Sequence, residues 1–290
     1  MAREAPRTVL SVCAPYQRDV DPSEYEVIVV DNGSRHPFTP GDCICRAPNL
    51  RIVAMPNPRP SPVFAMNWAA RNLACGELIL FSIDGARIFS DRLIFNCLRA
   101  HEQVDDAFVY TLACHLGPKV QMVSTTEGYD AETEDRLLNA SGWPDRTEAI
   151  YDISVFAGSS ISGFFKPISE SNAFDVPQTL LTQIGGFDER FTSPGGGLCN
   201  LEIFARYVTR AGARNVCLLS DMTFHQTHGG VATSGKIQWS VFDEEYKSIF
   251  GQSYSPPTYD SLFLGPIRPE ARRFLETSCD IALRATTNVG

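Results

Sequence analysis

Short runs of apolar residues, each ending in a turn signal, mark the first part of the chain. The clearest run, Tyr25 to Asp31, is β-branched and continuous, as expected for a strand buried on both faces of a parallel sheet. It ends in Asn32-Gly33-Ser34, which is a strong turn signal. A second apolar run covers Leu50 to Ala54. The pattern therefore predicts two strands separated by a loop.

A helical pattern follows the second strand. Ser61-Pro62 is suited to a helix start, and apolar residues recur at helical spacing from Val63 to Leu73. The next apolar run, Glu77 to Ile83, leads directly into Asp84. The order strand, helix, strand predicts a parallel sheet with a right-handed crossover. Ligands gather at the carboxyl ends of strands in such sheets, and both Asp31 and Asp84 are expected there.

The second half of the chain is less regular. Residues 130–143 are polar and predict a loop with a helical turn or two, and residues 150–165 could carry a short strand. An apolar stripe at helical spacing begins near Leu198 and ends at Gly212, so a helix is expected there. Val216 to Leu219 follows as a short strand.

The tail beyond Trp239 has the pattern helix, loop, helix. No repeat or low-complexity linker divides the 290 residues, which are enough for one large α/β domain. We therefore expect a main domain over residues 1–238 and a C-terminal helical extension over residues 239–290 that packs on it.

Composition and charge argue against some classes of function and cellular location. The formal net charge is −9 and no Lys/Arg-rich run is present, so a nucleic-acid partner is not expected. The longest apolar runs are far too short to cross a bilayer, and the N-terminus has no apolar signal core, so we expect no transmembrane segment and a cytoplasmic location. Nine cysteines without a Cys-x-x-Cys pair indicate reduced thiols.

Four blocks of sequence resemble the family-2 glycosyltransferases. Glu26 to Ser34 is similar to their nucleotide-binding strand, and Asn57 to Glu77 is similar to their Asn…Ala-Arg-Asn…Ala-x-Gly-Glu segment. Ile83-Asp84-Gly85-Ala86 falls where their Asp-x-Asp metal motif belongs. Gly185 to Phe191 (GGFDERF) is close to their Gly-Gly-Phe-Asp-Glu-x-Phe acceptor-side signature. Each block alone is weak, but their order is that of the family.

The resemblance implies a GT-A-like fold that binds a nucleoside diphosphate sugar. Asp31 and Asn32 would contact the nucleotide, with Asp31 accepting hydrogen bonds from the base. Arg71 would face the base or the pyrophosphate. Purely structural roles are the alternatives to nucleotide binding, because Asp31 could cap the turn before Gly33 and Arg71 could be a solvated charge on the helix surface.

The metal motif departs from the family pattern. Asp84 matches its first aspartate, but Ala86 replaces the second, and one carboxylate is a poor site for Mn²⁺ or Mg²⁺. Family-related enzymes can bring a late histidine to the metal, which points to His225 and His228. In an extended segment these two point to opposite faces, so we expect one of them, His225, to reach the ion. A histidine that only orients a loop or the diphosphate is the alternative.

The catalytic base also departs from the pattern. Inverting enzymes of this family place an acidic pair after the Gly-Gly-Phe-Asp-Glu block, and Gly197-Leu198 occupies that place here. Glu202 is the nearest substitute for deprotonating the acceptor hydroxyl, although an i,i+4 ion pair with Arg206 explains it equally well. Asp188 and Glu189 rank lower, because their block mainly shapes the acceptor loop.

Acceptor contacts are expected from Glu170, Asn172 and Asp188. Trp143 could stack on a sugar ring or simply pack against the core.

The start of the chain predicts a missing strand. In the family a first strand and a helix precede the nucleotide-binding strand, but too few residues separate Thr8–Ala14 from Tyr25 for a parallel crossover. Residues Ala2 to Val12 are therefore expected to be the crossover helix itself. Met1 would then be a late start or the edge of a fragment, and we expect the chain to be poorly stable and weakly active.

The apolar pattern predicts an α/β domain with a mainly parallel sheet flanked by helices, and the resemblance implies that it is a single GT-A-like domain. The expected reaction moves a sugar from a nucleoside diphosphate donor to a glycan or other hydroxyl acceptor, with inversion. The alternative is a catalytically inactive relative that still binds a nucleotide or a sugar. A nucleotidyltransferase would need a Gly-rich, Lys/Arg-containing loop after its first strand, and that feature is not seen.

Overall fold

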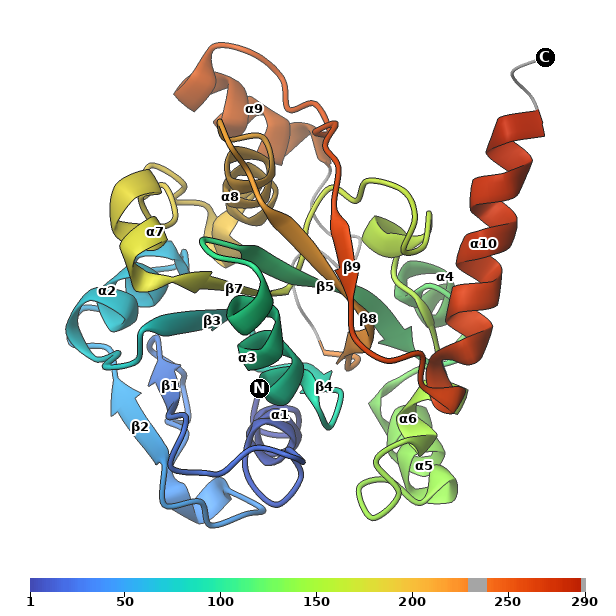
Figure 1. Cartoon of the computed structure of the whole chain (residues 1–290). Coiled ribbons are helices and arrows are strands. Elements are labelled where there is room, and N and C mark those ends of the chain that lie inside the picture. Colours follow the sequence, from blue (N-terminus) through green and yellow to red (C-terminus); the bar gives the residue numbers. More distant parts are fainter. Residues whose placement is uncertain (229–238, 288–290) are drawn as a thin grey trace.

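The computed structural model describes residues 1–228 and 239–287. Its centre is a seven-stranded sheet with helices on both sides (Figure 1), which confirms the α/β class expected from the sequence. Five strands form its main path in the order β3-β7-β5-β8-β4, while β6 pairs with β5 and β9 pairs with β8. Their bounds are β3 Leu78–Ser82, β4 Arg87–Phe89, β5 Phe108–Leu116, β6 Ser154–Phe156, β7 Ala173–Pro177, β8 Asn215–His225 and β9 Leu262–Leu264.

The prediction of a mainly parallel sheet is wrong. β5 and β8 are parallel, as are β8 and β9, but β7 runs antiparallel to both of its neighbours, and β4 and β6 are also antiparallel to their partners. β7 lies between β3 and β5 although about sixty residues of chain separate it from β5. A continuous apolar pattern indicates that both faces of a strand are buried. It does not indicate which strand lies beside it, or in which direction that neighbour runs.

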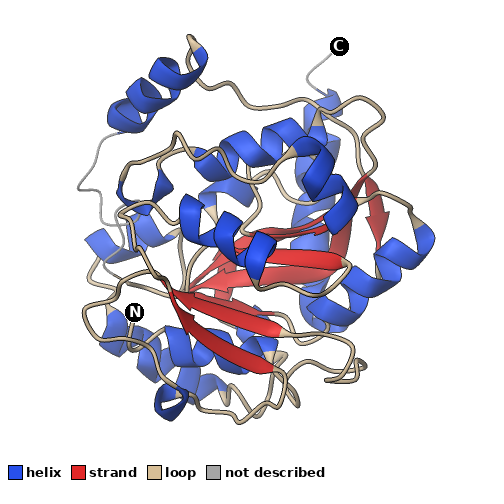
Figure 2. Ribbon diagram, turned by 90° about the vertical axis from the view of Figure 1, so that its left-hand side faces the viewer, coloured by secondary structure: helices blue, strands red, loops and turns tan. Residues whose placement is uncertain are grey.

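A second, separate sheet is formed by β1 (Val27–Asp31) and β2 (Leu50–Ala54), which are parallel. Figure 2 shows these two short strands beside the larger sheet. Among the described residues, no strand pairs with both β1 and β3. The helix expected at the N-terminus is confirmed as α1 (Ala5–Val12), which packs against β4.

Helices lie on both sides of the central sheet, and α2 packs against β1 of the smaller sheet (Figure 1). Their bounds are α2 Val63–Asn72, α3 Leu93–Gln103, α4 Gln121–Thr126, α5 Ala131–Ser141, α6 Ala149–Asp152, α7 Gln178–Ile184, α8 Cys199–Val208, α9 Trp239–Phe250 and α10 Arg272–Thr287. Among the described residues, no helix has the length and apolarity that a bilayer crossing requires. Aromatic side chains fill the space between the sheet and α8, where Phe108 lies between Phe174 and Phe204.

Helix α5 corrects the loop predicted for residues 130–143. The Asp130 side chain accepts a hydrogen bond from the Thr133 amide and caps the start, and Gly142 ends the helix in a left-handed conformation. Leu138 is the one buried apolar residue of this helix, so the sequence shows no apolar stripe at helical spacing. Its polar composition was therefore misleading, whereas its two capping residues were visible in the sequence.

The sequence predicted helix, loop, helix beyond Trp239, and the C-terminal segment also contains a short strand. Between α9 and α10 it contributes β9, which extends the central sheet beside β8. Residues Leu262–Leu264 of this segment therefore belong to the central sheet. The boundary placed at residue 238 lies outside the described residues.

Candidate functional site

Three side chains that could hold a metal meet beyond the ends of β3 and β8. Asp84 follows β3, His225 is the last residue of β8, and His228 lies three residues further on. One ligand atom from each residue lies within 4.8 Å of the other two. The His225 Nε2 atom is 3.9 Å from Asp84 Oδ2 and 3.0 Å from His228 Nε2.

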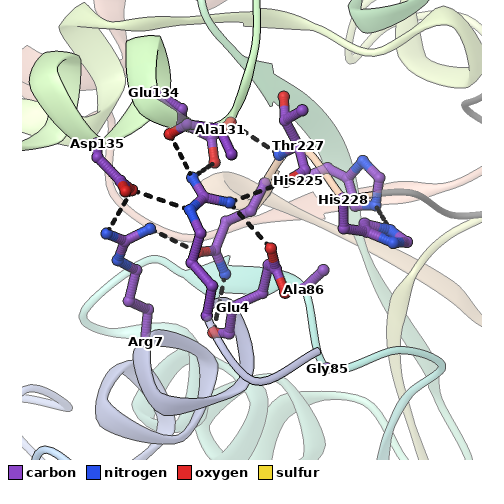
Figure 3. A network of polar contacts seen from close by, with 12 residues as sticks. Glu4, Arg7, Gly85, Ala86, Ala131, Glu134, Asp135, His225, Thr227 and His228 are labelled. Atoms are coloured by element: carbon purple, nitrogen blue, oxygen red, sulfur yellow. Dashed lines mark hydrogen bonds and ion pairs between the residues drawn. The ribbon is translucent and has the colours of Figure 1, made fainter.

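Both histidines therefore face Asp84, and the expectation that only His225 would do so is wrong. The alternation of side chains holds only while the chain is extended, and β8 ends at His225. After that residue the chain turns and brings His228 back toward the same side (Figure 3).

The hydrogen bonds of His225 indicate which nitrogen can bind a ligand. Its Nδ1 lies 2.7 Å from the Gln121 Oε1 atom, which can only accept, so Nδ1 carries the proton. Nε2 is then the unprotonated ring nitrogen, and it is the His225 atom that lies near Asp84 and His228. Burial, reinforced by Arg87, lowers the pKa of His225, and burial also lowers the pKa of His228. Both rings are therefore neutral near pH 7, the form in which imidazole is a ligand.

Asp84 is held in its ionised form. Burial alone would raise its pKa, but Arg87, the two histidines and the Ala86 amide together lower the pKa to about 2. The Arg87 Nε atom lies 3.1 Å from Oδ2, and the Ala86 amide donates to Oδ1 at 2.9 Å. The carboxylate is therefore ionised near pH 7.

This donor set fits a divalent cation. Two neutral imidazoles and one carboxylate suit Mn²⁺ and other first-row transition metals better than they suit Mg²⁺, which prefers oxygen ligands. Gln121 would act behind His225 as the group that fixes its ring. The missing second aspartate of the Asp84-Gly85-Ala86 motif is thus offset by two histidines.

A second polar cluster joins two of the predicted acceptor-binding residues. Asn200, in the first turn of α8, donates through Nδ2 to Glu170 at 2.9 Å and lies 3.4 Å from the Asn172 Oδ1 atom. The Asn200 Oδ1 atom is buried without a partner among the described residues. Ser82, at the end of β3, pairs with Ala173, at the start of β7. The chain therefore enters β7 from Asn172 where it leaves β3 toward Asp84.

Glu202 forms the i,i+4 ion pair with Arg206 that was the alternative to a catalytic role. Its carboxylate accepts two hydrogen bonds from Arg206, from Nε at 2.7 Å and from Nη2 at 3.0 Å, and its side chain is 8% exposed. Arg206 also donates to the backbone carbonyls of Ile184, the last residue of α7, and of Gly185 and Gly186, which follow it. This arrangement is an ion pair that closes a helix end, and it leaves Glu202 little freedom to take a proton.

Asp31 and Asn32 both organise loops. Asp31 accepts hydrogen bonds from the amides of Ser34, at 2.7 Å, and Phe38, at 2.8 Å. These amide bonds outweigh the effect of burial and lower its pKa. Asn32 donates to the Arg59 carbonyl at 2.7 Å and accepts from the Arg59 amide at 3.2 Å. Each oxygen keeps a lone pair, so a nucleotide contact is compatible with these bonds.

Two further predicted residues are in surface ion pairs. Arg71 on α2 pairs with Glu189, and Asp188 pairs with Arg190 at 2.6 Å. The bond between Arg71 and Glu189 joins the predicted nucleotide segment to the Gly-Gly-Phe-Asp-Glu block. Trp143 is buried and donates to the Tyr16 hydroxyl at 3.0 Å, so it packs in the core and does not form a sugar platform.

Sequence reasoning missed three residues of this region. Arg87 lies three residues after Asp84 at the start of β4, and a cation so close to a predicted metal ligand was a visible signal. Asn200 lies at the start of a predicted helix, next to the stretch that replaces the acidic pair. Gln121 had no local signal, because only the folded chain brings α4 to His225.

Comparisons with known proteins add a fold likeness of low score. No family model matches the chain, and no curated protein matches it. Among solved structures, residues 1–349 of TarS from S. aureus are 12% identical with a TM-score of 0.46, over 85% of this chain and 66% of that one.

The same TarS fragment in complex with UDP is 11% identical (TM-score 0.46, 86% of this chain and 67% of that one). Its complex with UDP-GlcNAc is 13% identical (TM-score 0.45, 86% and 69%). Of the longer TarS chain, this protein covers 41%. Likeness at this level carries no weight for function, which must be supported by the site itself.

Proposed function

We propose that this protein binds a nucleoside diphosphate sugar through a divalent cation held by Asp84, His225 and His228, and transfers the sugar to a hydroxyl group with inversion. The observation that carries the proposal is the meeting of these three side chains, from segments about 140 residues apart in sequence, within 4.8 Å of one another. Three such groups with neutral imidazoles and an ionised carboxylate form a donor set for a divalent ion.

The position of the triad supports a role in donor binding. It lies at the end of β3, next to the entry to β7, where Glu170 and Asn172 lie. When bound, the cation would neutralise the charge that develops on the departing diphosphate. Arg87 lies beside Asp84 and supplies a second positive charge to the same region. Asp31, Asn32 and Arg71 are proposed to contact the nucleotide.

Glu170 is the better candidate for accepting the acceptor's proton. Its Oε2 atom is oriented by the Asn200 side chain, and its Oε1 atom has no partner among the described residues. Glu202, by contrast, has both oxygens on Arg206. A base needs a free oxygen within reach of the hydroxyl, together with a second group that orients it. We therefore propose Glu170 as the base, with Asn172 and Asp188 in acceptor binding.

An inactive relative that only binds a nucleotide or a sugar is the second candidate. The ion pair between Glu202 and Arg206 favours it, because the residue nearest to the expected acidic pair is committed to structure. On this alternative the metal triad would still bind the donor, but the sugar would not be transferred.

Turnover separates the two candidates. The protein would be incubated with Mn²⁺ and a panel of nucleoside diphosphate sugars, with and without glycan acceptors, and release of the nucleoside diphosphate would be measured. We expect release that falls at least about a hundredfold in Glu170→Gln. Donor binding without release would favour the inactive relative. A large loss in Glu202→Gln with none in Glu170→Gln would return the role of base to Glu202.

A further inference from the structure

The turn that brings His228 to the metal site is fixed at Thr227. All three polar groups of this residue are bonded to other parts of the chain. Its amide donates to Glu134 Oε2 at 2.8 Å, its carbonyl accepts from Arg3 Nη1 at 2.9 Å, and its hydroxyl accepts from Gln121 Nε2 at 3.0 Å. Three separate segments, the N-terminal residues, α4 and α5, therefore hold one residue between the two histidines.

Arg3 and Glu134 are themselves a pair. The Arg3 Nη2 atom donates to Glu134 Oε1 at 2.7 Å, and the Glu134 side chain is fully buried. The remaining guanidinium bonds go to Glu4, Asp135 and the Ala131 carbonyl. Figure 3 shows Glu134 and Ala131 on one side of this network and Thr227 on the other. Every nitrogen of the Arg3 guanidinium is thus used, and two of its bonds go to the first turn of α5.

Neighbouring residues hold the same turn. The Gln226 amide donates to the Ala86 carbonyl at 2.8 Å, and the Gln226 side chain donates to the Glu4 carbonyl at 3.2 Å. Gln121 contacts both His225 and Thr227. The backbone from 225 to 228 is therefore bonded at each residue between the two histidines.

This bonding has a geometric consequence. In an extended chain the side chains of residues i and i+3 point to opposite faces, and His228 would then turn away from His225. The two rings instead lie with their Nε2 atoms 3.0 Å apart. The reversal needs a fixed orientation of the peptide groups on either side of Thr227, and those are the groups that Glu134 and Arg3 bind.

We propose that Arg3 and Glu134 are positioning residues of the metal site, which fix the Thr227 peptide groups so that His228 faces Asp84 and His225. This inference rests on the proposed function only for the presence of the cation. It assigns to Arg3 a role in metal binding, although Arg3 is not one of the three candidate ligands.

The test measures Mn²⁺ affinity by isothermal titration calorimetry on the full chain. We expect Arg3→Met to weaken Mn²⁺ binding about 10- to 100-fold, the range typical when a residue behind a metal ligand is lost. Arg136→Met is the matched control on α5, since its pair with Glu132 is exposed. Leu180→Ala, a core truncation on α7, controls for a general loss of stability. Both controls should keep the wild-type affinity.

A double-mutant cycle distinguishes positioning from general stability. If Arg3 acts through His228, the loss from Arg3→Met should nearly disappear once His228→Ala is already present. Should Arg3→Met fail to fold, Arg3→Lys keeps a cation against Glu134 but cannot reproduce the separate guanidinium bonds to Ala131 and Thr227, and the same cycle is measured on it.

Affinity within twofold of wild type in the Arg3 variant would overturn this inference, as would losses that simply add to that of His228→Ala. In either case the metal site itself would stand. A wild-type protein that binds no Mn²⁺ would overturn both this inference and the proposed metal-dependent function.

Discussion

Removing Arg206 tests whether Glu202 belongs to the structure or to catalysis. The guanidinium makes two hydrogen bonds to the Glu202 carboxylate and three to the backbone carbonyls of residues 184–186. Arg206→Met keeps much of the side-chain volume and removes all five bonds. It leaves Glu202, whose side chain is 8% exposed, as a buried charge without its partner.

The expected loss is large. Breaking a buried ion pair by removing one partner costs about 3–5 kcal/mol of unfolding free energy. A chain of 290 residues has an unfolding entropy of about 0.6 kcal/mol/K near its midpoint, from about 2.1 cal/mol/K per residue. The melting temperature should therefore fall by about 5–8 °C. Urea denaturation followed by circular dichroism gives the free energy, and a thermal scan gives the temperature.

The control for this prediction is another arginine at the same spacing. Arg136 pairs with Glu132 at i,i+4 on the surface of α5, with both side chains mostly exposed. Arg136→Met should cost about 0.5 kcal/mol or less. If Arg206→Met also cost less than about 1 kcal/mol, Glu202 would not be held by this pair. The residue would then be free to act as the catalytic base.

Two further outcomes follow from buried polar groups. Burial, only partly offset by hydrogen bonds from Ser90 and Asn96, raises the pKa of Asp221 to about 6. Because the folded state binds this proton more tightly than the unfolded state, whose pKa is near 3.8, stability should fall by on the order of 3 kcal/mol as pH rises from about 4 to about 6. Urea titrations across that range should show the fall in wild type, and an equal fall in Asp221→Asn would exclude Asp221 as its source. Asn67 is buried and bonds both the amide and the carbonyl of Phe187, at 2.9 and 2.8 Å. Asn67→Ala should therefore cost about 2–4 kcal/mol in the same assay, and a loss below about 0.5 kcal/mol would show that this bonding is dispensable.

The sequence predicted elements better than it predicted their partners. Strand β1 and helix α2 follow from apolar spacing and from turn and helix-start residues, which are local properties. Helix α1 was expected instead from the family resemblance, because too few residues precede β1 for a strand and a crossover. The insertion of β7 between β3 and β5 was not predicted, because the sequence of a strand does not indicate which distant strand it pairs with. The mixed direction of the sheet depends on that insertion.

The candidate site was predicted in part for the same reason. Asp84 and His225 were identified by motif and position, and the structure brings them together. The approach of His228 depends on bonds from Arg3 and Glu134, which lie far away in the sequence and match no motif. Such contacts arise only in the folded chain, where the residues before α1 and the first turn of α5 meet the turn that follows β8.

The central claim is that a divalent cation held by Asp84, His225 and His228 binds a nucleoside diphosphate. The direct measurement is the affinity of the protein for a panel of nucleoside diphosphates, with Mn²⁺ and with a chelator, in wild type and in Asp84→Ala. We predict binding by wild type that requires Mn²⁺ and that is lost in Asp84→Ala. Equal affinity with and without the cation, in both proteins, would contradict the metal site and leave Asp84 as a turn residue.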